Sequence, residues 1–142
     1  MKQLCARLRS LRRRATPAHL RTGAGGEKTA ARFLRSHGYK VLARNLRTPV
    51  GEADLICLAP DRRTVVVVEV KTRTASPGSD RPHVAPELAV NAAKRRKLLA
   101  VTQDLIRRRG WRGRTVRIDI VAIDVDARGK PTIRHHINAV HL

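Results

Sequence analysis

Three charged residues lie in or directly after two apolar runs of the sequence. Asp54 is part of residues 51–56, and Glu69 and Lys71 follow four consecutive valines. Charges are costly in a dry interior unless they are paired or bind a metal ion. Two carboxylates that come within a few ångströms repel each other, and a divalent cation relieves that repulsion. Because Mg²⁺ takes oxygen ligands, often one or two carboxylates plus water and phosphate, Asp54 and Glu69 are candidate ligands of such an ion.

Lys71 extends this chemistry, because residues two apart on a strand share a face and Lys71 therefore lies beside Glu69. A lysine in this position can steer a water molecule, deprotonate it in the neutral amine form, or offset the charge on an attacked phosphate as an ammonium group. The spacing alone leaves a structural interpretation open, in which Glu69 and Lys71 form an ion pair at a strand end and Asp54 caps a turn.

Further acidic residues have both a structural and a functional interpretation. Glu27 opens an expected helix, where a first-turn acid interacts favourably with the helix dipole; the alternative is a further carboxylate of the site. Glu52 shares a strand face with Asp54 and is a candidate supporting acid. Asp119 lies between apolar neighbours, which favours a structural hydrogen-bonding role over metal binding.

The elements that must position these residues follow from apolar periodicity, turn residues and helix caps. Expected helices cover residues 27–36 and, between the cap Asn91 and the stop Gly110, residues 92–109. Expected strands cover residues 39–46, 52–58, 64–71, 115–123 and 132–140. The four valines predict a central strand buried on both faces, and 132–140 is the expected edge strand. The order α-β-β-β-α-β-β predicts an α/β fold in which helices flank a mixed central sheet.

The charge of the chain points to a polyanionic partner. The 142 residues include 31 basic and 11 acidic side chains, for a net charge of +20. Seven of the basic residues and none of the acidic ones fall in the first 22, which predicts a flexible basic arm at 1–22 before a single domain at 23–142. Such a charge favours nucleic acid or an anionic membrane surface. With just Phe33, Tyr39 and Trp111 as aromatic residues, the chain lacks the rings of a base-stacking platform.

Individual basic residues are candidate phosphate contacts. Arg73 follows the charged strand end directly, and a second group belongs to the expected helix 92–109. The members of that group are Lys94, Arg95 and Lys97. A charge run on a helix is also typical of a solvated face, and the sequence leaves both interpretations open.

The cellular location follows from what the sequence lacks. No apolar stretch approaches the roughly 20 residues that cross a bilayer, and the basic N-terminus has no apolar core of a secretory signal. The start is compatible with a transit peptide or with a nucleic-acid-binding arm. The two cysteines, Cys5 and Cys57, have no metal-ligand spacing. We expect a reducing compartment, the cytoplasm, and no membrane partner.

An ordered set of short motifs resembles one family. The motifs are Gly26-Glu27, Gly38-Tyr39, Arg44-Asn45, the run 51–56, the run 68–73, Lys94, the run 117–120 and Asn138-Ala139. In this order they resemble the YraN-type family of endonuclease-like proteins, which is similar to the archaeal Holliday-junction resolvases of the PD-(D/E)XK nuclease superfamily. The resemblance covers about residues 20 to 142 and leaves the basic arm outside.

The resemblance implies a role for each matched residue. Asp54 and Glu69 would bind Mg²⁺ or Mn²⁺, with the main-chain carbonyl of Val70 as a third ligand. Lys71 would be the catalytic lysine, and Glu27 would be the acidic residue of the first helix that resolvase-like members use. The implied fold is a restriction-endonuclease-like core, and the implied assembly is a homodimer.

The resulting functional hypothesis is a metal-dependent endonuclease that hydrolyses phosphodiester bonds of DNA, with branched DNA as a candidate substrate. Two alternatives remain open at this point. One is a nucleic-acid-binding or processing factor that keeps the fold without catalysis. The other is a basic protein associated with RNA or the ribosome, whose nonspecific phosphate contacts would weaken steeply with salt.

Overall fold

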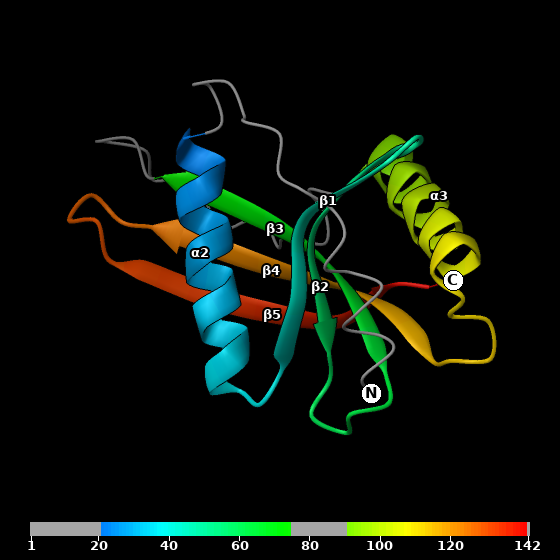
Figure 1. The fold of residues 1–142 in the computed structure, drawn as a ribbon. Coiled ribbons are helices and arrows are strands. Elements are labelled where there is room, and N and C mark those ends of the chain that lie inside the picture. The colour runs from blue at the N-terminus through cyan, green and yellow to red at the C-terminus, as the bar shows by residue number, and fades with distance from the viewer. Residues whose placement is uncertain (1–20, 75–90, 142) are drawn as a thin grey trace.

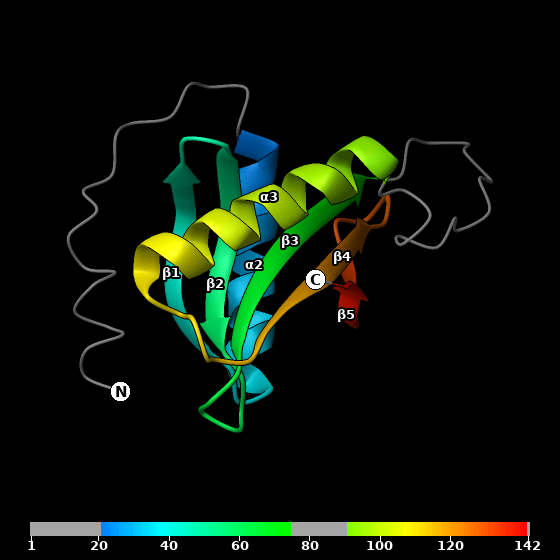
Figure 2. The same cartoon turned by 90° about the vertical axis from the view of Figure 1, so that its right-hand side faces the viewer.

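A five-stranded sheet lies between two helices in the computed structural model, which describes residues 21–74 and 91–141. Helix α2 (Arg21–Ser36) covers one face of the sheet and α3 (Ala92–Arg109) the other (Figures 1 and 2). The strands, in spatial as well as chain order, are β1 (Lys40–Thr48), β2 (Gly51–Leu58), β3 (Val65–Thr74), β4 (Val116–Val125) and β5 (Pro131–Val140). The predicted α/β class and the order α-β-β-β-α-β-β are confirmed.

The sheet is mixed because one connection crosses over a face. Strands β1, β2 and β3 pair antiparallel, as do β4 and β5, whereas β3 and β4 run parallel. Parallel neighbours need a crossover connection, and α3 lies in the segment that joins them. The predicted edge position of the last strand is confirmed, since β5 pairs with β4 alone.

The four valines of β3 divide between two hydrophobic cores. Val65 and Val67 pack in the core beneath α3, with Leu98 and Val101 of that helix. Val66 and Val68 pack in the core beneath α2, around Leu34. All four are fully buried, as predicted for a central strand with both faces covered. The same alternation turns Glu69 and Lys71 toward the α3 side of the sheet.

Helix α2 begins at Arg21, six residues before the predicted start at residue 27. The three glycines that precede Glu27 in the sequence lie inside the helix and do not break it. Gly26 explains why, because a Cβ there would lie 1.9 Å from the Thr72 hydroxyl of β3. The missing side chain lets the helix approach the strand closely, and this packing outweighs the low helix propensity of glycine.

Helix α3 has both of the caps that the sequence predicts. The Asn91 side chain accepts a hydrogen bond from the Lys94 backbone N–H at 2.9 Å, and Gly110 ends the helix in the left-handed conformation, φ 66°. This N-terminal cap fixes the geometry of the first helical turn, which carries Lys94. Strand β3 runs to Thr74, three residues beyond the predicted end at residue 71, and 75–90 lie outside the described residues.

The division into a basic arm at 1–22 and a single domain at 23–142 stays a prediction. Residues 1–20 of the predicted arm and Cys5 lie outside the described ranges, while α2 includes the last two residues of the arm. Cys57 is buried and unpaired, and burial raises the pKa of its thiol to about 12. Within residues 21–74 and 91–141, no helix is long and apolar enough to cross a membrane. The cytoplasmic location stays a prediction.

Candidate active site

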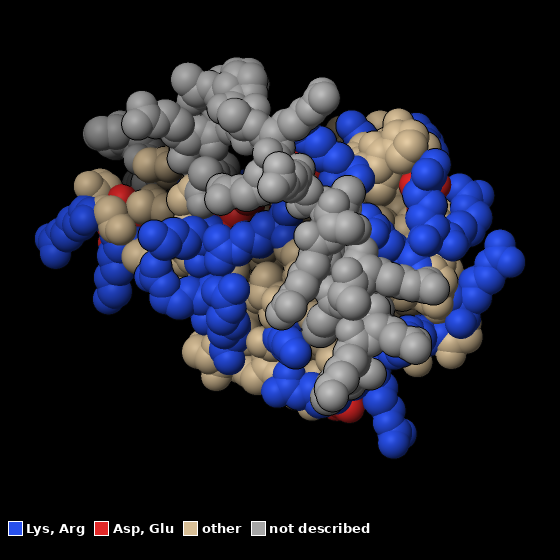
Figure 3. All heavy atoms as spheres, in the orientation of Figure 1, with Lys and Arg blue, Asp and Glu red and all other residues tan. Residues whose placement is uncertain are grey.

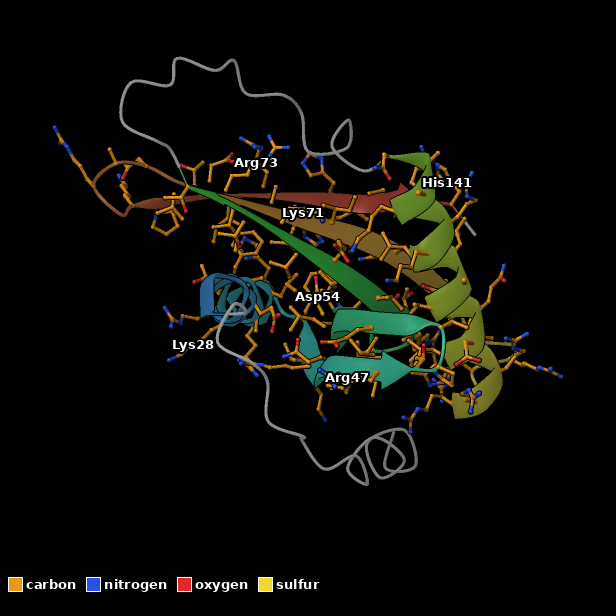
Figure 4. The ribbon with its side chains drawn as sticks, turned by 90° about the horizontal axis from the view of Figure 1, so that it is seen from above. Lys28, Arg47, Asp54, Lys71, Arg73 and His141 are labelled. Carbon is orange, nitrogen blue, oxygen red and sulfur yellow. The ribbon has the colours of Figure 1, made fainter. Side chains whose placement is uncertain are left out.

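The site lies where the ladder between β2 and β3 ends. Backbone pairing runs from Leu58 opposite Val65 to Leu55 opposite Val68. One residue further along, a side chain replaces the backbone, and Oδ2 of Asp54 accepts a hydrogen bond from the Val70 N–H at 2.7 Å. Figure 4 shows Asp54 and Lys71 in the space between the two helices. Asp54 therefore points at the strand that carries Glu69 and Lys71.

Glu69 is a buried carboxylate held by two lysines. Its side chain is 4% exposed, and Oε1 lies 3.1 Å from Nζ of Lys71 and 2.8 Å from Nζ of Lys94. The ion pair with Lys71 that the structural interpretation requires is present. It does not lie on an exposed strand face, however, and Lys94 of α3 adds a second cation from the other side. A carboxylate so deeply buried needs such partners to remain charged.

The environment of Asp54 opposes its ionisation. Burial and the nearby charge of Glu69 raise the pKa of Asp54 to about 7, against the lowering effect of the Val70 N–H. Glu27 raises the same pKa further and Lys94 lowers it. Near neutral pH, Asp54 is therefore a carboxyl that a bound cation would readily deprotonate.

Glu27 belongs to this group of acids and not to the first turn of its helix. It is the seventh residue of α2, and the first turn has no acidic residue, so the helix-dipole interpretation is wrong. Burial raises the pKa of Glu27, a hydrogen bond with Asn45 lowers it, and the charge of Glu52 raises it. The structure thus brings Glu27 within electrostatic range of Asp54.

Glu52 is not the supporting acid of Asp54 that the sequence predicted. It is exposed and pairs with Arg47 across the β1–β2 hairpin, with Oε2 3.0 Å from Nε. Strand alternation predicts that Glu52 and Asp54 share a face, but the pairing of β1 with β2 brings the positive charge of Arg47 into contact with Glu52. The hydrogen bond to the Val70 N–H instead turns Asp54 toward β3.

The oxygen ligands at this site suit a hard divalent ion that keeps some positions for water or substrate. Asp54 and Glu69 supply carboxylate oxygens, and the Val70 carbonyl faces the same strand edge as its N–H, toward Asp54. In the described part of the chain, no three His, Cys, Asp or Glu side chains form a group that could hold a metal. This excludes a closed, all-side-chain cage there. Two carboxylates are ligands that suit Mg²⁺, for which water and phosphate complete the shell.

The predicted phosphate contacts have different positions. Lys94 was expected to meet phosphate, but its ammonium lies on Glu69. Arg95 and Lys97 are exposed on α3, and Arg73 is exposed on β3 beyond Lys71 (Figure 4). For Arg73, Arg95 and Lys97 the contact with phosphate stays a prediction. The pairing of Lys94 with Glu69 is the feature of the site that the sequence analysis missed.

Asp119 has the structural role that the sequence favours. It is fully buried on the α2 side of β4 and accepts hydrogen bonds from the Arg117 guanidinium at 3.0 and 3.2 Å. Nε2 of His135 and the backbone N–H of Asn138, both on β5, lie 2.9 Å from its two oxygens. These four contacts occupy the carboxylate and leave it no capacity for a metal.

Comparison with known proteins identifies the family. Residues 26–123 match the family described as "Uncharacterised protein family UPF0102". A UPF0102 protein of Pelobacter propionicus is 37% identical over 128 residues, which cover 90% of this chain and 88% of the relative. A second, of Symbiobacterium thermophilum, is 39% identical over 121 residues, which cover 85% and 97%.

Among solved structures, Pyrococcus furiosus SfsA in complex with Ca²⁺ matches with a TM-score of 0.36 and 13% identity. The match covers 87% of this chain and 65% of SfsA, so the chain spans less than two thirds of that protein. The family assignment depends on the sequence matches alone. They confirm the YraN-type resemblance: the chain belongs to the uncharacterised protein family UPF0102.

Proposed function

We propose that this chain is a metal-dependent endonuclease that hydrolyses phosphodiester bonds of DNA. The observation that carries the proposal is the meeting of Asp54, Glu69 and Lys71 at the open end of the β2–β3 ladder. Two neighbouring acids, with a lysine on one of them, are groups that can hold a divalent ion and assist phosphodiester hydrolysis. Mg²⁺ or Mn²⁺ is the proposed cofactor, held by Asp54, Glu69 and the Val70 carbonyl.

Each residue has a definite task in this mechanism. A divalent ion, when bound, supplies Lewis-acid polarisation of the phosphate. Asp54 releases its proton when the ion binds, and Glu69 keeps Lys71 directed into the site. The Lys71 ammonium orients the attacking water and stabilises the negative charge that develops on the phosphate oxygens. The water oxygen bonds to phosphorus, one phosphorus–oxygen ester bond breaks, and the proton that the water loses ends on the leaving oxygen.

The charge of the molecule supports a nucleic acid as substrate. The net charge is +20, and Figure 3 shows Lys and Arg side chains spread over one face, with few acids among them. Such a field attracts polyanions and favours contacts with phosphates over contacts with bases. DNA, branched DNA in particular, and a homodimeric assembly enter the proposal through the family resemblance.

The test compares wild type with Glu69→Ala and Lys71→Ala on duplex, single-stranded, flap and four-way DNA. With Mg²⁺ or Mn²⁺, we expect each substitution to reduce cleavage at least about a hundredfold, because a group that stabilises the transition state is lost. Gel-shift affinity in EDTA should change little. Lys28→Ala is the matched control, since Lys28 is exposed on the side of α2 away from Asp54 (Figure 4). Cleavage by either site variant at the wild-type rate would refute the assignment.

A second candidate is a nucleic-acid-binding factor that keeps the fold without catalysis. One observation favours it: both lysines lie on the same oxygen of Glu69, so the acid is already neutralised in the absence of a metal. Wild-type protein that shifts DNA or RNA and cuts none of the panel in Mg²⁺ or Mn²⁺ would establish this alternative. RNA that copurifies through moderate salt would favour the RNA-associated form of it.

A further inference from the structure

The nearest cation to the buried carboxylate of the site comes from a different element. Nζ of Lys94, in the first turn of α3, lies 2.8 Å from Oε1 of Glu69, closer than Nζ of Lys71 at 3.1 Å. The Asn91 cap positions this turn through its hydrogen bond to the Lys94 N–H. The core residues Leu98 and Val101 hold the helix against the sheet. The Asn91 cap and the packing of α3 therefore hold Lys94 in a position from which it reaches Glu69.

The two lysines differ in how they can respond to a third positive charge. Lys71 lies two residues from Glu69 on the same strand, so the backbone keeps the two side chains adjacent. Lys94 reaches Glu69 across the space between α3 and β3, and its side chain is 36% exposed. A divalent ion that binds Glu69 repels both ammonium groups. The two lysines have the same four-carbon stem and nearly equal exposure, 36% for Lys94 and 34% for Lys71. The difference lies in the backbone, because no shared strand keeps Lys94 beside Glu69, and Lys94 can turn away from the carboxylate at the lower cost.

We propose that Lys94 is a positioning residue that exchanges between Glu69 and a substrate phosphate. In the metal-free protein its ammonium occupies Glu69. When the divalent ion binds, Lys94 releases the carboxylate and contacts a phosphate of the nucleic acid. Metal and nucleic acid then bind cooperatively, because each favours the position of Lys94 that the other needs. This inference rests on the proposed function and deepens it by coupling the metal to the substrate.

The first experiment measures Mn²⁺ affinity without nucleic acid, by electron paramagnetic resonance of free Mn²⁺. The variant is Lys94→Met, which keeps the apolar stem and removes the charge. We expect it to bind Mn²⁺ about tenfold more tightly than wild type, because one competing cation is gone. Lys28→Met, which removes an exposed lysine from the far side of α2, should stay within about twofold of wild type. Equal or weaker Mn²⁺ binding by Lys94→Met would overturn the proposal.

The second experiment measures DNA affinity by fluorescence anisotropy in EDTA and in Ca²⁺. In EDTA, Lys94 remains on Glu69, so Lys94→Met should bind DNA as wild type does. In Ca²⁺, wild type should bind DNA several-fold more tightly than in EDTA, and Lys94→Met should lose most of this gain. A loss of equal size in both conditions would show a simple phosphate contact and would overturn the exchange.

A charge-keeping variant covers the case in which Lys94→Met does not fold, which a thermal melt would reveal. Lys94→Arg can hold a carboxylate with two parallel hydrogen bonds, so we expect it to bind Mn²⁺ more weakly than wild type. Unchanged or tighter binding would contradict the inference. If Lys94→Met binds Mn²⁺ more tightly than wild type, and the wild-type protein cuts no DNA, the exchange is supported and the endonuclease is refuted. Absence of Mn²⁺ binding in both wild type and Lys94→Met would refute both.

Discussion

Asp119 and Asp54 lie on opposite sides of β3 and show two ways of placing an acid in this fold. Asp119 is opposite Val68 in the β3–β4 ladder, and Asp54 bonds to Val70 two residues further along β3. Asp119 accepts from the Arg117 guanidinium and lies in hydrogen-bond contact with His135 and with the Asn138 N–H. For Asp54, the described contacts supply one hydrogen bond, from Val70.

The pKa values of the two acids move in opposite directions. Burial alone would raise the pKa of Asp119, but the contacts with His135 and Arg117 and the Asn138 N–H lower it below its ordinary value. Burial also raises the pKa of Asp54, and there the charge of Glu69 adds to the effect and brings the pKa to about 7. Burial is thus common to both acids, and the difference lies in the number of donors and in the sign of the nearest charge.

This difference separates a structural acid from a candidate functional one. The oxygens of Asp119 are fully used, so the residue joins β4 to β5 and has nothing left for a ligand. Among the residues that the structure describes, Asp54 has unused acceptor capacity and an acidic neighbour, and a bound cation would satisfy both. Buried acids in this fold therefore indicate function where protein donors are missing, and structure where they are present.

The largest expected effect breaks the structural side of the comparison. Asp119→Ala should lower the free energy of unfolding by about 3 kcal/mol, because it leaves the partly buried Arg117 and the Asn138 N–H without their acceptor. Urea unfolding at pH 7 measures the loss. Glu52→Ala removes an exposed ion pair and should cost less than about 1 kcal/mol. A loss for Asp119→Ala as small as the one expected for Glu52→Ala would show that the Asp119 contacts add little stability.

Asp54→Asn should have the opposite sign. In the folded protein the pKa of Asp54 is about 7, above its ordinary value of 3.8, so the charged form destabilises the fold. The cost is absent below about pH 4, grows as the pH rises toward 7 and is constant above. At pH 8 without metal, Asp54→Asn should be more stable than wild type by about 1–2 kcal/mol. Urea unfolding at pH 4 and pH 8 tests this, and a difference that is the same at both pH values would contradict it.

The sequence was sufficient for those parts of the site that depend on local pattern. Four valines predicted the central strand because β-branched side chains suit a surface that is buried twice. Asp54 and Glu69 stood out because a charge within an apolar run needs an explanation. Asn91 and Gly110 predicted the ends of α3 because their side-chain and backbone preferences act within a few residues.

The parts that were missed depend on contacts between distant segments. Lys94 is 25 residues from Glu69 in the sequence, and no local pattern shows that the first turn of α3 faces β3 at that point. In the sequence, Gly26 looks like a helix breaker. In the structure it lies inside α2 because it allows a close approach to Thr72. Arg117 could be paired with Asp119 from strand alternation, whereas His135 required the register of β5.

The binding of metal should sharpen the comparison, since Asp54 is expected to respond to it and Asp119 is not. Mg²⁺ at ten times its dissociation constant should stabilise wild type by about 1.4 kcal/mol at pH 8. The effect should shrink toward pH 6, because Asp54 must first lose its proton. Thermal melts in Mg²⁺ and in EDTA measure it. Asp54→Asn should lose the shift. A shift that persists in this variant would place the ion elsewhere.

The smallest expected effect concerns Glu27, which belongs to the site only if its charge reaches Asp54. Glu27→Gln removes one of the charges that raise the pKa of Asp54, so this pKa should fall slightly from about 7 toward its ordinary value. Carbon-13 NMR of the Asp54 carboxyl during a pH titration follows the change. Glu52→Gln is the matched control, because the charge of Glu52 acts on Glu27, and Asp54 responds to Glu69 and Glu27. If the two variants shift the Asp54 titration equally, the charge of Glu27 acts through the general field of the surface. A shift confined to Glu27→Gln makes Glu27 the third acid of the group on the functional side of the comparison.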